Sequence, residues 1–565
     1  MSARAFPAGD AIEPRRGAAV MLEVLRSEGV RYIFGNPGTT ELPLMDALTG
    51  APDIEYVWGL QEAAVVAMAD GYAQASGKPG FVNLHTAGGL GHAMGAILNS
   101  QSAGTPLVIT AGQQDTRHNL ADPLLFGDLV KIAAPAMKWT HEITHPDQIP
   151  VIVRRALHDC AAAPSGPVFL SLPMNVMEEM STVGIADVST IDRAAVAGSL
   201  ERLADILAKV EPGRLAIVAG DEISTSGASA ETVALAETLG APVFGSSWPA
   251  HIPFPTAHPQ WRGSLPTKAS DIRAMLEPFD AVFALGGKST ITILYSEGPA
   301  VPPDCRVYQL SADVRDLGRT YATALSCMGD IRASLAVLLP MLERKLARHR
   351  PAIAELREEA ARERDARRRE LRDRAEAERA APVMTPLVAA TELVRAIGPN
   401  VPIVDEAPAT MGPVRSLLNS SSPRQYSLCR GGVLGWGMSA AVGTSLGLDR
   451  QPVVSLVGDG AAMYAPQALW TAAHERLPVT FVVLNNREYN ILKNFMKGQT
   501  HYLSARANSF IAMDLVDPPI DFQALAASMG VPARRVERPE DVAGAIEAGI
   551  ASGAPNLVEI VIAAT

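Results

Sequence analysis

The sequence has few cysteines and no excess of basic residues. Four cysteines occur among 565 residues, and none stands in a CxxC or other metal-ligand spacing. We therefore expect buried free thiols in a reducing compartment rather than a disulfide framework. The formal net charge of −11 and the pI of about 5.6 argue against a nucleic-acid partner, because a phosphate backbone needs a basic face. The cysteines are Cys160, Cys305, Cys327 and Cys429.

Long apolar segments are also missing. No run of 18 uncharged apolar residues occurs, so no membrane span is expected. Residues Met1 to Arg16 carry charges and two prolines but lack the apolar core of a secretory signal. The expected location is therefore the cytoplasm. A composition of 48% hydrophobic and 19% charged residues is typical of a globular protein with large cores.

Short apolar runs instead alternate with helical patterns in each third of the chain, which predicts parallel sheets covered by helices. Helices are expected at 62–75 and 91–102. Strands are expected at 32–34, 81–85, 107–110, 168–172, 215–218, 281–285, 401–404, 453–457, 479–484 and 556–562.

The resulting fold class is α/β, with three consecutive doubly wound parallel-sheet domains. Their expected bounds are 15–185, 195–340 and 383–565. The intervening segment 341–382 is dense in Arg, Glu and Ala, which predicts a solvated helix with ion pairs four residues apart.

Two turns in the last third carry the strongest functional signal. The predicted strand 453–457 runs into Gly458-Asp459-Gly460, and after 24 further residues the strand 479–484 runs into Asn485-Asn486. Both turns follow carboxyl ends of strands, where open α/β sheets bind ligands. Backbone N–H groups of Gly460 and Ala461 at a helix start favour a phosphate. Oxygens of Asp459 and Asn486 suit a hard cation shared with a diphosphate.

A carboxylate in the first third is the second signal. Glu62 lies in the first turn of a predicted helix, where the helix dipole favours a negative charge. Taken alone, such a glutamate is an ordinary helix start. The Gly71-Tyr72-Ala73 stretch follows it within the same helix.

These motifs resemble those of thiamine diphosphate-dependent enzymes of the 2-oxo acid decarboxylase and acetolactate synthase-like superfamily, most closely the benzoylformate decarboxylases. Segments 35–43, 83–89, 110–114, 253–263 and 432–435 extend the resemblance over nearly the whole chain. It implies that the three domains bind the pyrimidine, form a central domain and bind the diphosphate. Thiamine diphosphate and Mg²⁺ are the implied cofactors.

The resemblance also implies residue roles. Glu62 would hydrogen-bond N1′ of the aminopyrimidine, and His85 and Thr39 would be catalytic. Metal ligands would be Asp459, Asn486 and the carbonyl of Glu488. The Gly432 carbonyl would accept a hydrogen bond from the 4′-amine, and Leu434 would separate the two rings of the cofactor. Further cofactor contacts are implied for Thr410, Gly458, Gly460, Ala461, Tyr489 and Ile491.

The sequence departs from the family pattern in three places. The central-domain stretch 286–295 has no histidine where the family has its second catalytic one, and Ile293 takes that place. The turn Ala407-Pro408-Ala409 lacks two hydroxyls that usually touch the diphosphate, which leaves Thr410 and backbone amides. Segment 497–513 is longer than in the relatives and is a candidate lid.

The predicted function is non-oxidative decarboxylation of a small-molecule 2-oxo acid, with carboligation as a further activity. An acetolactate synthase-like carboligase and an acyl-CoA type lyase or decarboxylase stay open as alternatives. An inactive thiamine diphosphate-binding protein is the alternative of a different class, and Glu62 argues against it. The resemblance further implies a homo-oligomer, a dimer of dimers. The charge balance and the lack of long apolar runs predict no nucleic-acid or membrane partner.

Overall fold

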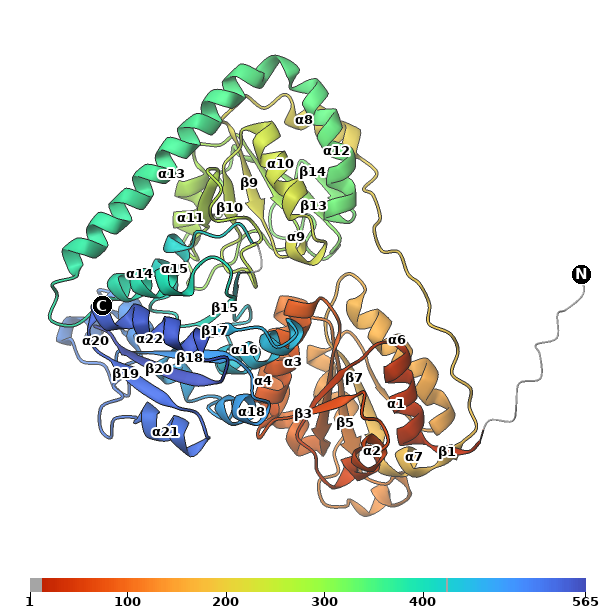
Figure 1. Ribbon diagram of the computed structural model, residues 1–565. Coiled ribbons are helices and arrows are strands. Elements are labelled where there is room, and N and C mark those ends of the chain that lie inside the picture. Colours follow the sequence, from red (N-terminus) through yellow and green to blue (C-terminus); the bar gives the residue numbers. More distant parts are fainter. Residues whose placement is uncertain (1–12, 423–424, 565) are drawn as a thin grey trace, which may run out of the picture. The chain divides into compact units, whose positions relative to one another are not determined.

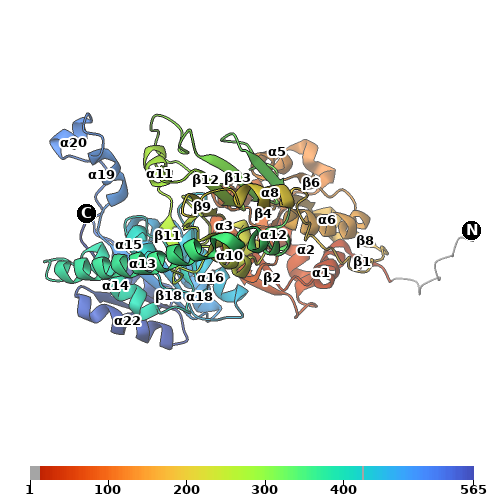
Figure 2. The ribbon, with the colours of Figure 1, turned by 90° about the horizontal axis from the view of Figure 1, so that it is seen from above.

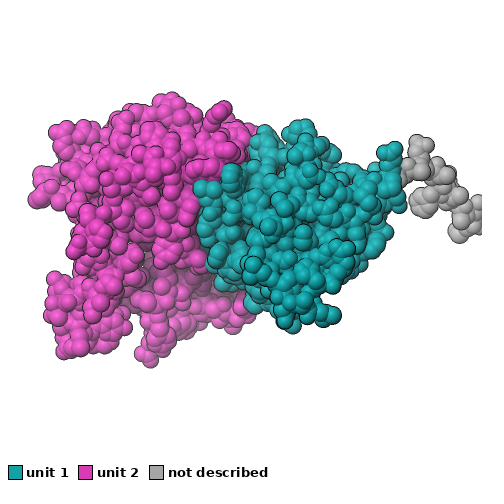
Figure 3. Space-filling view, turned by 90° about the horizontal axis from the view of Figure 1, so that it is seen from below, with its two compact units in different colours: residues 1–191 teal, residues 192–565 magenta. Residues whose placement is uncertain are grey.

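The computed structural model describes residues 13–422 and 425–564, so residues 1–12 of the segment weighed as a secretory signal lie outside it. The chain forms two compact units, residues 1–191 and 192–565 (Figure 3). The first unit contains one six-stranded parallel sheet and the second contains two (Figure 1). The predicted class, three parallel-sheet α/β domains, is confirmed.

The first sheet lies between two layers of helices. Figure 1 shows α3 and α4 on one side of this sheet and α1 and α6 on the other. Every residue of β5 is buried, as expected for a central parallel strand. In spatial order the strands are β3 (Glu55–Trp58), β2 (Tyr32–Gly35), β4 (Gly80–His85), β5 (Leu107–Gln113), β7 (Val168–Pro173) and β6 (Thr140–Glu142). The helices are α1 (Gly17–Ser27), α2 (Leu42–Leu48), α3 (Glu62–Ser76), α4 (Thr86–Ala103), α5 (Leu129–Ala133), α6 (Ile149–Ala161) and α7 (Met174–Glu178).

The second sheet belongs to the central domain and has a different strand order. Its order reverses between β9 and β12, which are neighbours although β10 and β11 come between them in the chain. In spatial order the strands are β11 (Trp261–Ser264), β10 (Val243–Gly245), β9 (Leu215–Ala219), β12 (Ala281–Leu285), β13 (Arg306–Ser311) and β14 (Leu325–Met328). The helices are α8 (Leu200–Leu207), α9 (Glu222–Thr225), α10 (Ser229–Leu239), α11 (Ala269–Leu276) and α12 (Ile331–Lys345).

The third sheet repeats the strand order of the first. If the six strands of each are numbered along the chain, both sheets run second, first, third, fourth, sixth, fifth. In spatial order the strands are β16 (Tyr426–Leu428), β15 (Ile403–Glu406), β17 (Val453–Gly458), β18 (Val479–Asn485), β20 (Asn556–Val561) and β19 (Ala533–Val536). The helices are α14 (Pro386–Ile397), α15 (Met411–Leu417), α16 (Trp436–Gly447), α17 (Asp459–Ala462), α18 (Ala468–His474), α19 (Asn490–Lys497), α20 (Leu503–Ala507), α21 (Phe522–Ser528) and α22 (Pro539–Ala551).

The charged segment between the second and third sheets is one long helix, α13 (Arg350–Glu378), visible in Figures 1 and 2. Pairs four residues apart, Arg362–Glu358 and Arg367–Glu363, each lie at 3.9 Å. The helix is not solvated on all sides, because Arg368 donates to the main-chain carbonyls of Thr256 and Leu418. It therefore ties the central domain to the third domain.

Other sequence predictions can be compared directly. All four cysteines are free and buried, as expected. In the part of the chain that the structure describes, no helix is long and apolar enough to cross a membrane. The domain bounds 15–185, 195–340, 341–382 and 383–565 stay predictions.

Candidate active site

The carboxyl ends of β17 and β18 lie side by side in the third sheet. Asp459, the first residue of α17, is 4% exposed. Its Oδ1 accepts a hydrogen bond from the N–H of Gly460 at 2.7 Å, and its Oδ2 accepts one from the N–H of Arg487 at 2.6 Å. Burial raises the pKa of the Asp459 carboxyl to about 6. The carboxylate is thus held in place by backbone donors from both turns.

The two asparagines at the end of β18 differ in their contacts. Asn485 is buried, and its Nδ2 donates to Oε1 of Glu559 at 2.7 Å. Asn486 is half-buried, and its Oδ1 accepts from the N–H of Glu488 at 3.1 Å. Asn486 is therefore the amide of this pair that retains surface for a ligand.

The donor atoms of these turns suit Mg²⁺. Asp459, Asn486 and the carbonyl of Glu488, the predicted metal ligands, supply only oxygen atoms. Within residues 13–422 and 425–564, no group of three or more His, Cys, Asp or Glu residues could hold a metal ion. A small oxygen donor set fits a Mg²⁺ ion that takes its remaining ligands from a diphosphate and water.

The side chain of Glu488 is occupied elsewhere. Its carboxylate forms an ion pair with Lys493 and accepts a hydrogen bond from Nδ2 of Asn490 at 2.8 Å. Lys493, whose side chain is 9% exposed, also pairs with Asp514 at 2.5 Å. The turn after β18 is thereby connected to the residue that follows segment 497–513.

The turn after β15 has a similar backbone anchor. The carboxylate of Glu406 accepts hydrogen bonds from the N–H groups of Trp436 at 3.1 Å and Gly437 at 2.9 Å. Burial raises the pKa of Glu406 to about 7. Thr410 is 1% exposed, and its Oγ1 donates to the carbonyl of Ala407 at 3.2 Å. The hydroxyl oxygen of Thr410 retains acceptor capacity but its proton is used within the turn.

Backbone next to these turns borders open space. A Cβ built on Gly432 or Gly458 would meet no described atom within 4 Å. Gly432 has a φ of +71°, which favours glycine. Leu434 is 37% exposed. Room for a ligand beside Gly432, Leu434 and Gly458, together with the oxygen donors, is consistent with a diphosphate-bearing cofactor.

The remaining predicted cofactor contacts surround α17 and the start of α19. Gly460 packs against Tyr489 so closely that a Cβ would lie 2.4 Å from its ring. Ala461 is 7% exposed, and Ile491 is half-buried on α19. The N–H of Tyr489 donates to the carbonyl of Met513 at 2.8 Å, so segment 497–513 returns to this turn. Figure 2 shows α20, which lies within that segment, and α19, which leads into it, standing apart from the third sheet.

In the first unit, Glu62 begins α3 and is 9% exposed. Its Oε1 accepts from Nδ2 of Asn36 at 3.1 Å, and its Oε2 lies 3.2 Å from Nδ1 of His92. A Cβ on Gly89 would approach the Glu62 side chain to 3.3 Å. The carboxylate is therefore sheltered by α4 but keeps part of its surface open.

His85 ends β4 and lies against the 3₁₀ turn Thr39–Glu41. Its Nδ1 lies 2.8 Å from Oε2 of Glu41 and 3.1 Å from Oγ1 of Thr40. The hydrogen bond with Glu41 raises the pKa of His85, against the opposing effect of burial. Thr39, the predicted catalytic hydroxyl, is exposed, and it is Thr40 that contacts the imidazole.

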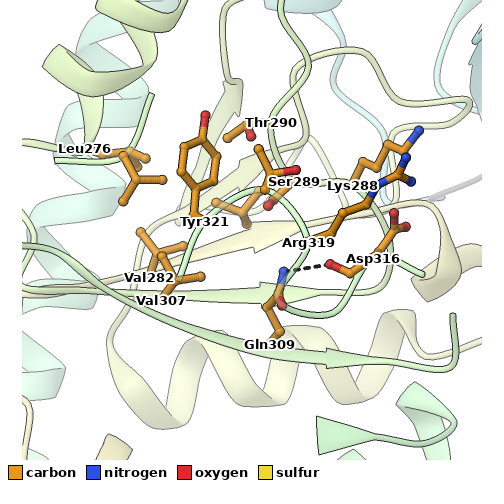
Figure 4. Close-up of a pocket in the computed structure, with 13 residues that line it drawn as sticks. Leu276, Val282, Lys288, Ser289, Thr290, Val307, Gln309, Asp316, Arg319 and Tyr321 are labelled. Carbon is orange, nitrogen blue, oxygen red and sulfur yellow. Dashed lines mark hydrogen bonds between the residues drawn. The ribbon is translucent and has the colours of Figure 1, made fainter. Parts of the chain in front are cut away.

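The central domain contains a cavity of about 240 Å³ (Figure 4). Part of its lining comes from the stretch 286–295, which lacks a histidine. Lys288, Ser289 and Thr290 line this cavity with Arg319 and Tyr321. The side chain of Ile293, which takes the place of the histidine, is 49% exposed and is not among the lining residues.

Three contacts were not anticipated from the sequence. Glu41 lies in the quoted segment 35–43, but only the fold shows that it contacts His85. His92 reaches Glu62 from α4, and Lys493 pairs with two carboxylates. The roles of all the site residues remain predictions at this point.

Comparison with known proteins gives three matches to family models for the thiamine pyrophosphate (thiamine diphosphate) enzymes. The N-terminal cofactor-binding domain matches residues 15–148, the central domain residues 200–338, and the C-terminal cofactor-binding domain residues 411–560. These matches confirm the predicted family and its cofactor, thiamine diphosphate.

Individual relatives cover nearly the whole chain. Benzoylformate decarboxylase of Pseudomonas aeruginosa is 31% identical over 95% of this chain and 97% of its own. The acetolactate synthase isozyme 3 large subunit of Escherichia coli is 25% identical over 94% and 91%. The solved structure of the Rhodococcus jostii RHA1 thiamine diphosphate-dependent 4-hydroxybenzoylformate decarboxylase has a TM-score of 0.85 at 28% identity, covering 98% of this chain and 100% of that one. The likeness to the decarboxylases supports the prediction of a thiamine diphosphate-dependent carboxy-lyase.

Proposed function

Because the chain belongs to the family of thiamine pyrophosphate enzymes, we propose that it catalyses the non-oxidative decarboxylation of a 2-oxo acid. The observation that carries the proposal is the pair of oxygen-donor turns at the adjacent ends of β17 and β18, fixed by the hydrogen bond from Arg487 to Asp459. The substrate class rests on the 31% identity to benzoylformate decarboxylase over 95% of the chain.

Bound thiamine diphosphate supplies a carbon nucleophile and an electron sink for loss of CO₂. Asp459, Asn486 and the Glu488 carbonyl would hold the Mg²⁺ that binds the diphosphate. Glu62 would hold a proton at N1′ of the pyrimidine, and Leu434 would contact both rings. Further contacts are proposed for Thr410, Gly432, Gly458, Gly460, Ala461, Tyr489 and Ile491.

Release of an aldehyde requires a proton at the former carbonyl carbon, and His85 is the proposed source. Its hydrogen bond to Glu41 favours the protonated imidazole. Thr39 is proposed to contact the substrate, since it is exposed beside this histidine pair. Ile293 leaves an apolar side chain where the family has its second histidine. That replacement favours a more apolar substrate pocket.

Carboligation is the second candidate, supported by the 25% identity to an acetolactate synthase subunit over 94% of this chain. An acyl-CoA type lyase or decarboxylase is the third. We further propose a homo-oligomer acting on a small molecule, without nucleic-acid or membrane partners. The four free, buried thiols favour a reducing compartment such as the cytoplasm.

A substrate panel tests the proposal. The protein, with thiamine diphosphate and Mg²⁺, is incubated with aromatic and aliphatic 2-oxo acids and with 2-hydroxyacyl-CoA and oxalyl-CoA. CO₂ and aldehyde in equal amounts from a 2-oxo acid are expected. Acyloin or acetolactate-type products would favour the carboligase, and turnover of only CoA substrates would favour the acyl-CoA enzyme. Absence of turnover with proven cofactor binding would contradict all three.

A further inference from the structure

The carboxylate of Glu41 receives more donors than a surface glutamate would. Glu41 is 2% exposed. Its Oε1 accepts from Oγ1 of Thr40 at 2.7 Å and from the N–H of Gly112 at 3.0 Å. Its Oε2 accepts from the N–H of Gly38 at 2.9 Å and lies 2.8 Å from Nδ1 of His85. Each oxygen of this buried carboxylate therefore contacts two hydrogen-bonding groups.

Two glycines make room for the Glu41–His85 pair. A Cβ on Gly38 would lie 2.3 Å from Cγ of the His85 ring, and a Cβ on Gly112 would lie 2.0 Å from Oε1 of Glu41. Neither position could carry a side chain without displacing the pair. Gly38 precedes the 3₁₀ turn and Gly112 lies in β5, so the pair is enclosed by segments far apart in the sequence.

We propose that Glu41 is a positioning residue that binds Nδ1–H of His85 and thereby presents Nε2 as the nitrogen that exchanges protons with the substrate. This inference rests on the proposed function only in naming what receives the proton. Nε2–H gives up its proton, the neutral ring keeps Nδ1–H bonded to Glu41, and water later returns a proton to Nε2.

Other groups near His85 act in the same direction or do not compete. The charge of Glu62 adds to that of Glu41 in raising the pKa of the imidazole, whereas burial lowers it. Thr40 bonds both members of the pair. Burial and the charge of Glu41 both raise the pKa of the Tyr56 phenol far above the neutral range, so Tyr56 stays uncharged. Glu41 is thus the group that contributes most to the raised pKa of His85.

The test removes the negative charge of the Glu41 side chain and keeps its size and shape. Glu41→Gln keeps one acceptor oxygen, replaces the other oxygen with an NH2 group, and cannot stabilise an imidazolium as a carboxylate does. Exchange of the imidazole C2 hydrogen of His85 with deuterium, followed by mass spectrometry across pH in the full-length protein, reports the pKa of this histidine without any turnover. In the variant the midpoint is expected to fall toward the ordinary value of about 6.5.

Controls within the chain are available. His92 lies in the same region of sequence and bonds Glu62 rather than Glu41, so its exchange profile should be the same in both proteins. Glu28→Gln removes a half-buried carboxylate of the first unit, one that contacts His158 at 3.3 Å. That variant should leave the profile of His85 unchanged. Glu41→Asp, which keeps the charge, should restore part of the shift.

Turnover adds a second readout. With the best substrate of the panel, Glu41→Gln should lower kcat by about tenfold or more, with the 10²–10⁴-fold contribution of a complete acid–base group as the upper limit. The acidic-to-basic midpoint of its pH profile should move with that of His85. An unchanged His85 exchange profile in a folded Glu41→Gln protein would overturn the proposal, whatever the substrate proves to be. A shifted profile in a protein that decarboxylates nothing would instead contradict the proposed function alone.

Discussion

The main-chain N–H of Arg487 donates a hydrogen bond to Oδ2 of Asp459 over 2.6 Å, linking the turns after β17 and β18. Arg487 has a φ of +60°, which is uncommon for a residue with a side chain. The left-handed conformation accompanies the chain reversal that brings this N–H to the carboxylate. Gly460 supplies a donor to the other oxygen at 2.7 Å. The carboxylate is therefore already oriented for the proposed metal ion, which would lower the cost of forming the site.

Asp459→Ala is expected to abolish stabilisation by the cofactor. At a cofactor concentration 100 times its Kd, a single site stabilises the folded protein by about 2.7 kcal/mol. The variant removes the charged ligand from the predicted metal site, so the rise in unfolding temperature with thiamine diphosphate and Mg²⁺ should largely vanish. Asp541→Ala, an exposed substitution on α22, is the control. An equal rise in both variants would contradict the assignment of Asp459.

Glu62→Gln is expected to keep cofactor binding and lose turnover by about 10²–10⁴-fold. An amide in the same position cannot hold the proton at N1′ of the pyrimidine as a carboxylate does. Proton exchange at C2 of the bound cofactor, measured by NMR after acid quench, should slow in parallel. Glu55→Gln, which removes a carboxylate paired with Arg31 at 3.2 Å, should retain normal exchange. Normal exchange in Glu62→Gln would remove Glu62 from the proposed site.

The fold was predictable because its central strands are continuous apolar runs. The expected strand 281–285 coincides with β12, and the expected helix 62–75 lies within α3. Short edge strands such as β3 and β16 were not predicted, because strands of three or four residues give little periodic signal. The predicted start of the helix after β4 was also wrong, because α4 begins at Thr86 and not at residue 91.

The site residues likewise divide into those that a local sequence pattern indicates and those that it does not. The adjacency of Asp459 and Asn486 could be predicted because each follows a recognisable strand within a short motif, and the structure places the two strand ends side by side, while their role as metal ligands stays a prediction. The role of Glu41 could not be predicted from the sequence. One N–H donor to its carboxylate comes from the nearby Gly38, but the other comes from Gly112, 71 residues away. Such pairs depend on which strands become neighbours, here β2, β4 and β5. The local sequence does not indicate which strands become neighbours.

Lys493→Met is expected to loosen segment 497–513, which follows the turn after β18. The substitution leaves Glu488 and Asp514 without their shared cation. A loss of about 1.4 kcal/mol in the free energy of local opening would make cleavage within 497–513 tenfold faster. Limited proteolysis of the folded protein measures this rate. Lys497→Met, at the exposed end of the same helix, should be cleaved like the wild type, and equal rates in the two variants would refute the role of Lys493.

Stability should depend on pH through the Glu41–His85 pair. The folded pKa of His85 is raised above its unfolded value of about 6.5, so the pair stabilises the fold fully below that pH. This contribution is lost as pH rises through the folded pKa. The difference in unfolding temperature between wild type and Glu41→Gln should therefore be larger at pH 5.5 than at pH 8.5. In a His85→Asn background the same comparison should show no pH dependence.

The last prediction concerns assembly, which the family resemblance implies. If each active site combines the first domain of one subunit with the third domain of another, Glu62→Gln and Asp459→Ala chains should complement each other. Random reassembly makes half of the dimers mixed, and each mixed dimer has one undamaged site. Mixing the two inactive proteins after dissociation should then restore about a quarter of the activity of wild type treated identically.

A matched mixture distinguishes this arrangement from a site built within one chain. When wild type is reassembled with chains that carry both Glu62→Gln and Asp459→Ala, every shared site in a mixed dimer contains one damaged domain. Mixed dimers would be inactive, and activity should fall to about a quarter of the wild-type value. If each site instead lay within one chain, the wild-type subunit would stay active in the mixed dimer and half of the activity would remain. Native mass spectrometry of the mixtures verifies that mixed dimers have formed, because without subunit exchange a shared site would also give no activity in the first mixture and half of the activity in the second.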